Sequence, residues 1–143
     1  QLIWQCGHKH FNQYKNLTNH KNIIKKEFFN NIHYAYGASD IVVSRAGAMA
    51  LNEIAFMEKA MILIPLPSSA ANHQFYNAKN FHDNKAAIMI EEKSMKDNII
   101  EKKISKLFNN LNQLESMGLN ARELIVKDAN KKIIEQIVHL LKK

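Results

Sequence analysis

The chain has 143 residues, of which 46% are hydrophobic and 23% are charged, and its formal net charge is +7. This length and composition are typical of one soluble globular domain that buries about two thirds of its unfolded surface. A single cysteine excludes an internal disulfide and a multi-cysteine zinc site, so we expect Cys6 to be a buried, unreactive thiol.

The positive charge raises the question of a nucleic-acid partner. Lysines are spread over residues 9–26, 93–106 and 127–143, and the only arginines are Arg45 and Arg122. Proteins that bind DNA or RNA gather arginines and stacking aromatics in one patch, which this sequence lacks. We therefore expect solvated helix faces and no nucleic acid, while the charge favours a moderate attraction to anionic membrane surfaces.

The amino-terminal part predicts two strands and two helices. Residues 1–6 form a strand that Gly7 ends, residues 9–19 a short amphipathic helix, and residues 22–26 a second strand. Residues 30–38 predict a helix with Asn30 as its N-cap. Because the chain begins inside a strand and without methionine, we expect a fragment that starts in mid-fold.

Phe28 and Phe29 lie in the loop between the second strand and the helix that follows. Phenylalanine is more often a core residue than a ligand contact. Strand-to-helix loops, however, collect at one edge of a sheet and often carry function. We therefore keep a core role and a ligand-facing role open for both residues.

Residues 40–78 form the segment around which we expect the fold to be organised. Residues 41–43 predict a buried strand, residues 44–47 a tight turn, and residues 47–57 a helix. In a parallel sheet this junction lies at the carboxyl ends of the strands, where the free N–H groups of the helix bind an anion such as phosphate. Glu53 lies off the apolar face and can accept two hydrogen bonds from a vicinal diol. A diol and a diphosphate together describe a nucleotide.

The rest of the chain continues the alternation. Residues 61–65 predict a strand buried on both faces, residues 68–72 a polar loop, residues 72–84 a helix and residues 86–90 a strand. From Ser94 onward a helix is predicted, with Ser94 and Asp97 at capping-box spacing and Asn109-Asn110 ending the run. Two further helices are predicted at residues 111–126 and 130–141. The sequence thus predicts a single α/β domain, with a Rossmann-like parallel sheet and helices on both faces.

Several familiar site motifs are missing. The sequence contains no G-x-G-x-x-G, no G-x-x-x-x-G-K-[ST] and no H-E-x-x-H, and Ser44 lacks the flanking glycines of a nucleophile elbow. His8 and His10 are closely spaced, but a pair of this kind on a loop usually faces solvent rather than a metal. We expect no metal and no cofactor. The sequence also lacks the pattern of a signal peptide, and its longest apolar run, residues 61–66, is far shorter than the roughly 20 residues that span a bilayer.

Five short motifs nevertheless resemble those of one family. They are Ser44-Arg45-Ala46-Gly47-Ala48, Asn52-Glu53-Ile54-Ala55, Ile64-Pro65-Leu66-Pro67, His73-Gln74 and Asn77-Ala78. Together with Glu27-Phe28-Phe29 they resemble the carboxy-terminal domain of the MurG family of glycosyltransferases, from about Gln1 to the end of the chain. These inverting enzymes transfer GlcNAc from UDP-GlcNAc to lipid I, undecaprenyl-pyrophosphoryl-MurNAc-pentapeptide, and form lipid II in peptidoglycan synthesis. They have the GT-B architecture of two Rossmann-like domains, the second of which binds UDP-GlcNAc.

The resemblance implies a substrate-binding set in this chain. Backbone groups of the Phe28–Phe29 loop would hold the uracil, with Ile32 packing nearby, and Glu53 would bind the ribose hydroxyls. The diphosphate and the sugar would be bound by residues of the quoted motifs: Arg45, the backbone of Gly47, Ala48, Met49 and Ala50, and the side chains of His73, Gln74 and Asn77.

Two departures from the family are visible. Residues 57–60 are Met-Glu-Lys-Ala where the family commonly has glycine and Lys-Pro, which should alter the turn but not the pocket. His73 stands where some members carry glutamine, so its contact with the sugar can differ from theirs.

The resemblance also implies a peripheral protein at the cytoplasmic face of the bacterial plasma membrane. Lipid I and the general base would belong to an acceptor domain outside residues 1–143, so we expect this chain alone to bind UDP-GlcNAc weakly or not at all, and not to turn over. Two alternatives stay open. One is a stand-alone GlcNAc-transferase subunit or a nucleotide-sugar epimerase of the same architecture, and the other is a non-catalytic α/β interaction module.

Overall fold

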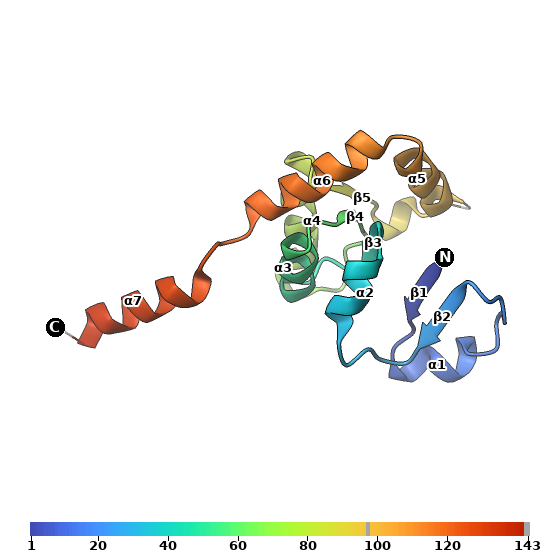
Figure 1. Cartoon of the computed structure of the whole chain (residues 1–143), viewed down its shortest axis with the longest axis horizontal. Helices are drawn as coiled ribbons and strands as arrows, with labels where there is room; N and C mark the ends of the chain where they lie inside the picture. The colour runs from blue at the N-terminus through green and yellow to red at the C-terminus, as the bar shows by residue number, and fades with distance from the viewer. Residues whose placement is uncertain (97, 142–143) are drawn as a thin grey trace.

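The structure, a computed structural model, describes residues 1–96 and 98–141. Strands and helices alternate along most of the chain (Figure 1), which confirms the predicted α/β class. The elements are β1 (Leu2–Gln5), α1 (His8–Tyr14), β2 (Ile23–Lys26), α2 (Ile32–Ala38), β3 (Ile41–Ser44), α3 (Ala48–Phe56), β4 (Ala60–Leu63), η1 (Ala70–Asn72), α4 (His73–Asp83), β5 (Ala87–Met89), η2 (Glu92–Ser94), α5 (Ile99–Phe108), α6 (Leu111–Leu124) and α7 (Ala129–Leu141).

The strands form two parallel sheets, β1-β2 and β3-β4-β5, and not the single sheet that we expected. The doubly wound fold has the strand order 3-2-1-4-5-6, in its own numbering and not that of β1–β5 here. In that order strands 3 and 2 are joined to strands 4, 5 and 6 only through strand 1. The two observed sheets correspond to these two parts. No strand of the described residues occupies the position between them, so β1 and β3 each pair on one side only.

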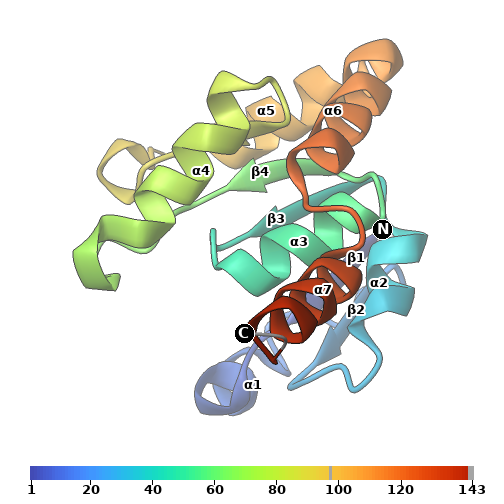
Figure 2. The same ribbon diagram turned by 90° about the vertical axis from the view of Figure 1, so that its left-hand side faces the viewer.

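The three-stranded sheet carries the core on both faces. All four residues of β4 are buried, as the continuous apolar run predicts. Because side chains alternate along a strand, Met61 and Leu63 face one cluster and Ala60 and Ile62 face another. The first cluster contains Leu51, Ile54 and Ala55 of α3 with Ala78 and Phe81 of α4, and the second contains Leu107 of α5 and Met117 of α6. Figure 2 shows α3 and α4 beside β3 and β4.

Helix α6 packs closely on the end of α3. A Cβ atom on Gly118 would lie 2.0 Å from the carbonyl oxygen of Glu58, so only glycine fits at this crossing. Glu58 itself has φ of 54°, a left-handed conformation that favours glycine. Arg122 donates from Nη1 to the Phe56 carbonyl at 3.1 Å and lies 4.0 Å from the centre of the Phe56 ring. These contacts fix the carboxyl end of α3.

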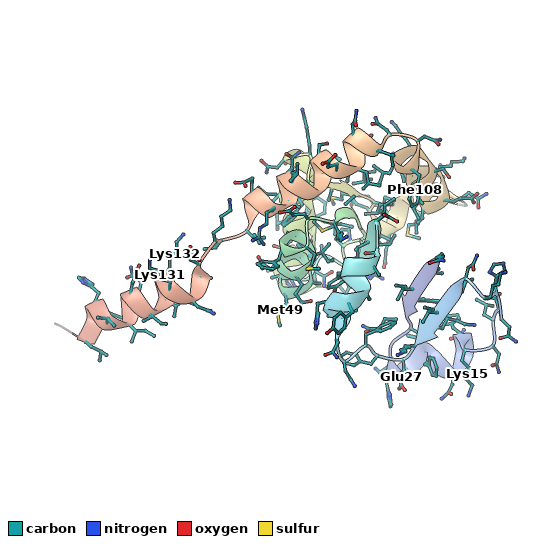
Figure 3. All side chains as sticks on the ribbon, in the orientation of Figure 1. Lys15, Glu27, Met49, Phe108, Lys131 and Lys132 are labelled. Carbon is teal, nitrogen blue, oxygen red and sulfur yellow. The ribbon has the colours of Figure 1, made fainter. Side chains whose placement is uncertain are left out.

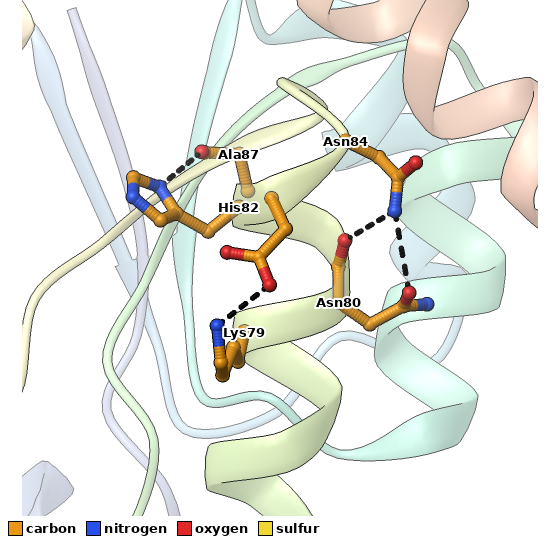
Figure 4. Close-up of polar contacts among 6 residues, drawn as sticks. Lys79, Asn80, His82, Asn84 and Ala87 are labelled. Atoms are coloured by element: carbon orange, nitrogen blue, oxygen red, sulfur yellow. Dashed lines mark hydrogen bonds and ion pairs between the residues drawn. The ribbon is translucent and has the colours of Figure 1, made fainter.

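The end of α4 is shown in Figure 4. Lys79 pairs with Asp83 at 2.7 Å, and Asn84 donates to the Asn80 carbonyl at 2.8 Å. A ring nitrogen of His82 contacts the Ala87 carbonyl at 3.2 Å and so ties the helix to β5. The predicted helix at residues 72–84 and strand at residues 86–90 are thus confirmed within one or two residues.

The amino-terminal unit, which consists of β1, α1 and β2, and the last helix, α7, stand apart from this core. In the amino-terminal unit, Trp4 packs on Tyr14 with ring centres 5.2 Å apart, and Lys25 donates to the Lys15 carbonyl at 2.7 Å. Helix α7 extends away from the other elements (Figure 1), and its apolar side chains are exposed. These are Ile133, Ile134, Ile137, Val138, Leu140 and Leu141.

Some predicted boundaries are wrong. Helix α1 ends at Tyr14 instead of residue 19, and Leu17 is exposed. Asn31, and not Asn30, is the N-cap of α2, and its side chain makes no capping hydrogen bond. Ser94 ends η2 and α5 begins after Asn98, so Ser94 does not cap that helix, and its expected partner Asp97 lies outside the described residues.

Candidate functional site

The start of α3 offers free backbone donors at the carboxyl end of β3. Gly47 is the N-cap, and the Leu51 N–H donates to the Gly47 carbonyl at 3.0 Å as the first bond of the helix. The N–H groups of Ala48, Met49 and Ala50 therefore precede the helical ladder. The Met49 side chain is 78% exposed and points outward (Figure 3). Such a helix start attracts an anion through its N–H groups and its dipole.

The loop before α3 is held from two sides. On one side, Asn77 of α4 donates from Nδ2 to the carbonyl of the fully buried Ala46 at 3.0 Å. On the other side, Arg45 Nη1 donates to the Ile64 carbonyl at 3.2 Å and lies 2.5 Å from Glu92 Oε1. The Ser44 hydroxyl donates to the Arg45 carbonyl at 3.0 Å. These contacts orient the helix start relative to the sheet.

Glu53 is exposed on α3, on the side opposite Leu51, Ile54 and Ala55, which confirms its predicted position off the apolar face. Tyr36 lies on α2, the helix that follows the Phe28–Phe29 loop. Burial, and then the negative charge of Glu53, raise the pKa of Tyr36 above its usual value.

The Phe28–Phe29 loop rests on β1. Phe28 is 67% exposed, while Phe29 is partly buried and its N–H donates to Gln5 Oε1 at 2.9 Å. Lys26 Nζ lies 5.4 Å from the centre of the Phe29 ring, and Ile32 is partly buried at the start of α2. We kept a core role and a ligand-facing role open for both residues. Because Phe28 is exposed, the core role is wrong for this residue. Cys6, expected to be buried, is only partly so.

The start of α4 follows a tight turn in which Ala71 and Asn72 have φ of 46° and 54°. His73 is exposed, and its Nδ1 contacts the Ala70 carbonyl at 2.7 Å. Gln74 accepts at Oε1 from the Leu66 N–H at 3.0 Å, which leaves its amide NH₂ group for other partners. This segment is joined to the β3–α3 loop through the bond from Asn77 to Ala46.

The structure thus joins the starts of α3 and α4 by direct contact, from the Asn77 amide to the Ala46 carbonyl. Contacts of the Phe28–Phe29 loop lead to β1 instead. Sequence reasoning missed two residues that contact the predicted set: Gln5, which accepts from the Phe29 N–H, and Glu92, which pairs with Arg45. Gln5 and Glu92 both follow the pattern of polar residues at or just after the carboxyl end of a strand, a signal that could have identified them.

A cavity of about 530 Å³ opens beside the loop, between the ends of β3 and β4 and the segment after β5. It is lined by Val43, Ser44, Arg45, Ile64, Glu92 and Met95. Within the described ranges, no group of three or more histidine, cysteine, aspartate or glutamate side chains could hold a metal ion, and His8 and His10 are exposed. Nor does any helix of this part of the chain combine the length and apolarity that crossing a membrane requires.

Parallel strands, crossover helices and an anion-attracting helix start at a strand end define a Rossmann-like α/β domain. Residues 1–137 match the model of the glycosyltransferase family 28 C-terminal domain, and the chain belongs to this family. It is similar to the UDP-N-acetylglucosamine--N-acetylmuramyl-(pentapeptide) pyrophosphoryl-undecaprenol N-acetylglucosamine transferase of Flavobacterium psychrophilum, with 33% identity over 99% of this chain and 38% of the relative.

Two further comparisons agree. The transferase of the same name from Vesicomyosocius okutanii is 36% identical over 95% of this chain and 40% of its own length. The crystal structure of Acinetobacter baumannii MurG superposes with a TM-score of 0.83 and 26% identity, over 96% of this chain and 40% of that one. The family resemblance and the fold are thereby confirmed. The chain spans about two fifths of the length of these relatives.

Proposed function

We propose that this chain is the donor-binding domain of an inverting GT-B glycosyltransferase that transfers GlcNAc from UDP-GlcNAc to lipid I and forms lipid II. The observation that carries the proposal is the free helix start at Ala48–Ala50 with an exposed carboxylate, Glu53, on the same helix. Membership of family 28 and the names of the relatives support this choice of substrates.

Each part of the donor has a proposed partner. The N–H groups of Ala48, Met49 and Ala50 bind the diphosphate and stabilise the charge that develops on UDP as it leaves. Glu53 accepts two hydrogen bonds from the ribose diol. The uracil lies against the Phe28–Phe29 loop beside Ile32, and the sugar lies against His73, Gln74 and Asn77. Gly47 and Arg45 belong to the loop that carries the helix start.

We assign no catalytic residue within residues 1–143. The general base that deprotonates the acceptor hydroxyl, and the binding of lipid I, are proposed to belong to a separate acceptor domain. The chain is proposed to act at the cytoplasmic face of the plasma membrane, where its net charge of +7 favours anionic lipids. Lys131 and Lys132 on α7 are among the lysines that add to this charge (Figure 3).

Titration of the chain with UDP, followed by amide resonances and calorimetry, tests the assignment. Glu53→Ala removes two charge-assisted hydrogen bonds, and we expect about 30- to 1000-fold weaker binding of UDP. Glu115→Ala, on exposed α6 surface, is the control with the same change of charge. 2′-Deoxy-UDP removes one diol hydroxyl, so it should bind more weakly than UDP to the wild type but equally to Glu53→Ala.

Two results would contradict the proposal. If Glu53→Ala and Glu115→Ala bind UDP alike, Glu53 does not contact the ribose. If UDP leaves the amide resonances of Ala48–Ala50 and the melting temperature unchanged, the chain is better described as a non-catalytic α/β interaction module.

A further inference from the structure

Arg45 is turned toward β4 and η2, although it lies in the loop that leads into α3. Its Nη1 donates to the Ile64 carbonyl, directly after β4, and lies 2.5 Å from Glu92 Oε1, at the start of η2. One guanidinium therefore connects the chain at the carboxyl ends of three neighbouring parallel strands, β3, β4 and β5. The contact forms part of the lining of the cavity beside the loop.

The loop is short and its opposite side is already anchored. Ala46 is fully buried and accepts from Asn77, so between the anchors at Arg45 and Ala46 the backbone has little freedom before Gly47 and the helix start. Losing the anchor at Arg45 would release one side of this loop. The Arg45 and Glu92 side chains are 49% and 39% exposed, so the pair adds little to global stability and its effect is local.

We infer that Glu92 is a positioning residue for the diphosphate site. By holding the Arg45 guanidinium on the β4 end, Glu92 fixes the loop of residues 44–47, and with it the direction of the free N–H groups of Ala48–Ala50. This inference rests on the proposed function for the diphosphate, although the effect of Glu92 on the loop does not. Glu92 touches no substrate and acts through Arg45.

Three variants separate position from charge. Glu92→Ala removes the acceptor for Arg45, whereas Glu92→Gln removes the charge but keeps a carbonyl oxygen that can accept from Nη1. Glu91→Ala is the matched control. It makes the same change of charge at the neighbouring position, and Glu91 pairs with Lys93 at 2.9 Å. The chain is titrated with UDP and with uridine, and hydrogen exchange of the amides of residues 45–48 is measured without ligand.

We expect Glu92→Ala to weaken UDP binding by about two- to fivefold, to leave uridine binding unchanged and to speed exchange of the loop amides. Glu92→Gln should restore most of the UDP affinity, and Glu91→Ala should resemble the wild type. Tighter UDP binding by both Glu92 variants would overturn the inference, because Glu92 would then be a competitor of the phosphates for Arg45. Unchanged loop exchange in Glu92→Ala would also overturn it. If the wild type does not bind UDP, the proposed function fails, and the exchange measurement still decides the role of Glu92.

Discussion

Replacing Gly118 with alanine perturbs the contact that fixes the end of α3 against α6. The added Cβ would lie 2.0 Å from the Glu58 carbonyl oxygen and 2.6 Å from its carbonyl carbon. Ordinary contact begins at about 3.4 Å, so α6 and the Glu58 turn would have to separate by roughly 1.4 Å. The obstructing atoms are backbone and cannot rotate away as a flexible side chain would.

We therefore expect a cost near the upper end of the range for overpacking, about 3 kcal/mol of unfolding free energy, and a fall in melting temperature of about 8 to 12 °C. Urea unfolding and thermal melts followed by circular dichroism measure both quantities. Gly37→Ala is the matched control, because its Cβ would lie 3.5 Å from the flexible end of Met57 and should cost little. If Gly118→Ala melts within about 1 °C of Gly37→Ala, the close approach of α6 to α3 is not present in solution.

Three further substitutions test contacts around the site. Glu58→Gly should raise the unfolding free energy by about 1 kcal/mol in urea titrations, since Glu58 holds a left-handed φ of 54°, and a destabilised variant would contradict that geometry. Burial, and then Glu53, raise the pKa of Tyr36, so the stability from its neutral form is present below about pH 10 and is lost as pH rises through the raised pKa. Ultraviolet titration should show that Tyr36→Phe removes a late-ionising tyrosine. Glu53→Gln should lower the pKa of Tyr36 only in part, because burial is the larger cause of the shift. An unchanged Tyr36 pKa in Glu53→Gln would show that the charge of Glu53 does not act on Tyr36. Arg122→Ala should cost about 1 kcal/mol in the same urea assay through loss of its bond to the Phe56 carbonyl and its contact with the ring, and Arg122→Lys should recover only part of this.

The sequence predicted those features that depend on local pattern. The apolar run in β4 indicated burial on both faces because helices cover both sides of a parallel sheet. Helical spacing placed Glu53 opposite Leu51 and Ile54, and the structure agrees. The positions of α3 and α4 followed from the same periodicity.

Other features depend on contacts between distant segments. Periodicity does not encode strand order, so the separation into two sheets could not be predicted from alternation alone. Glu92 meets Arg45 only because β3, β4 and β5 lie side by side. The choice between Asn30 and Asn31 as N-cap depends on one backbone turn, because both residues have the same side chain.

The one-sided pairing of β1 and β3 has a consequence for self-association of the chain in solution. The unpaired edges of β1 and β3 present main-chain donors and acceptors that no described strand satisfies, and Leu2 and Val43 on these strands are exposed. Unprotected margins of this kind recruit strands from other molecules. Sedimentation velocity across a dilution series is therefore expected to show reversible self-association, and isotherms for any ligand are best collected at concentrations below its onset.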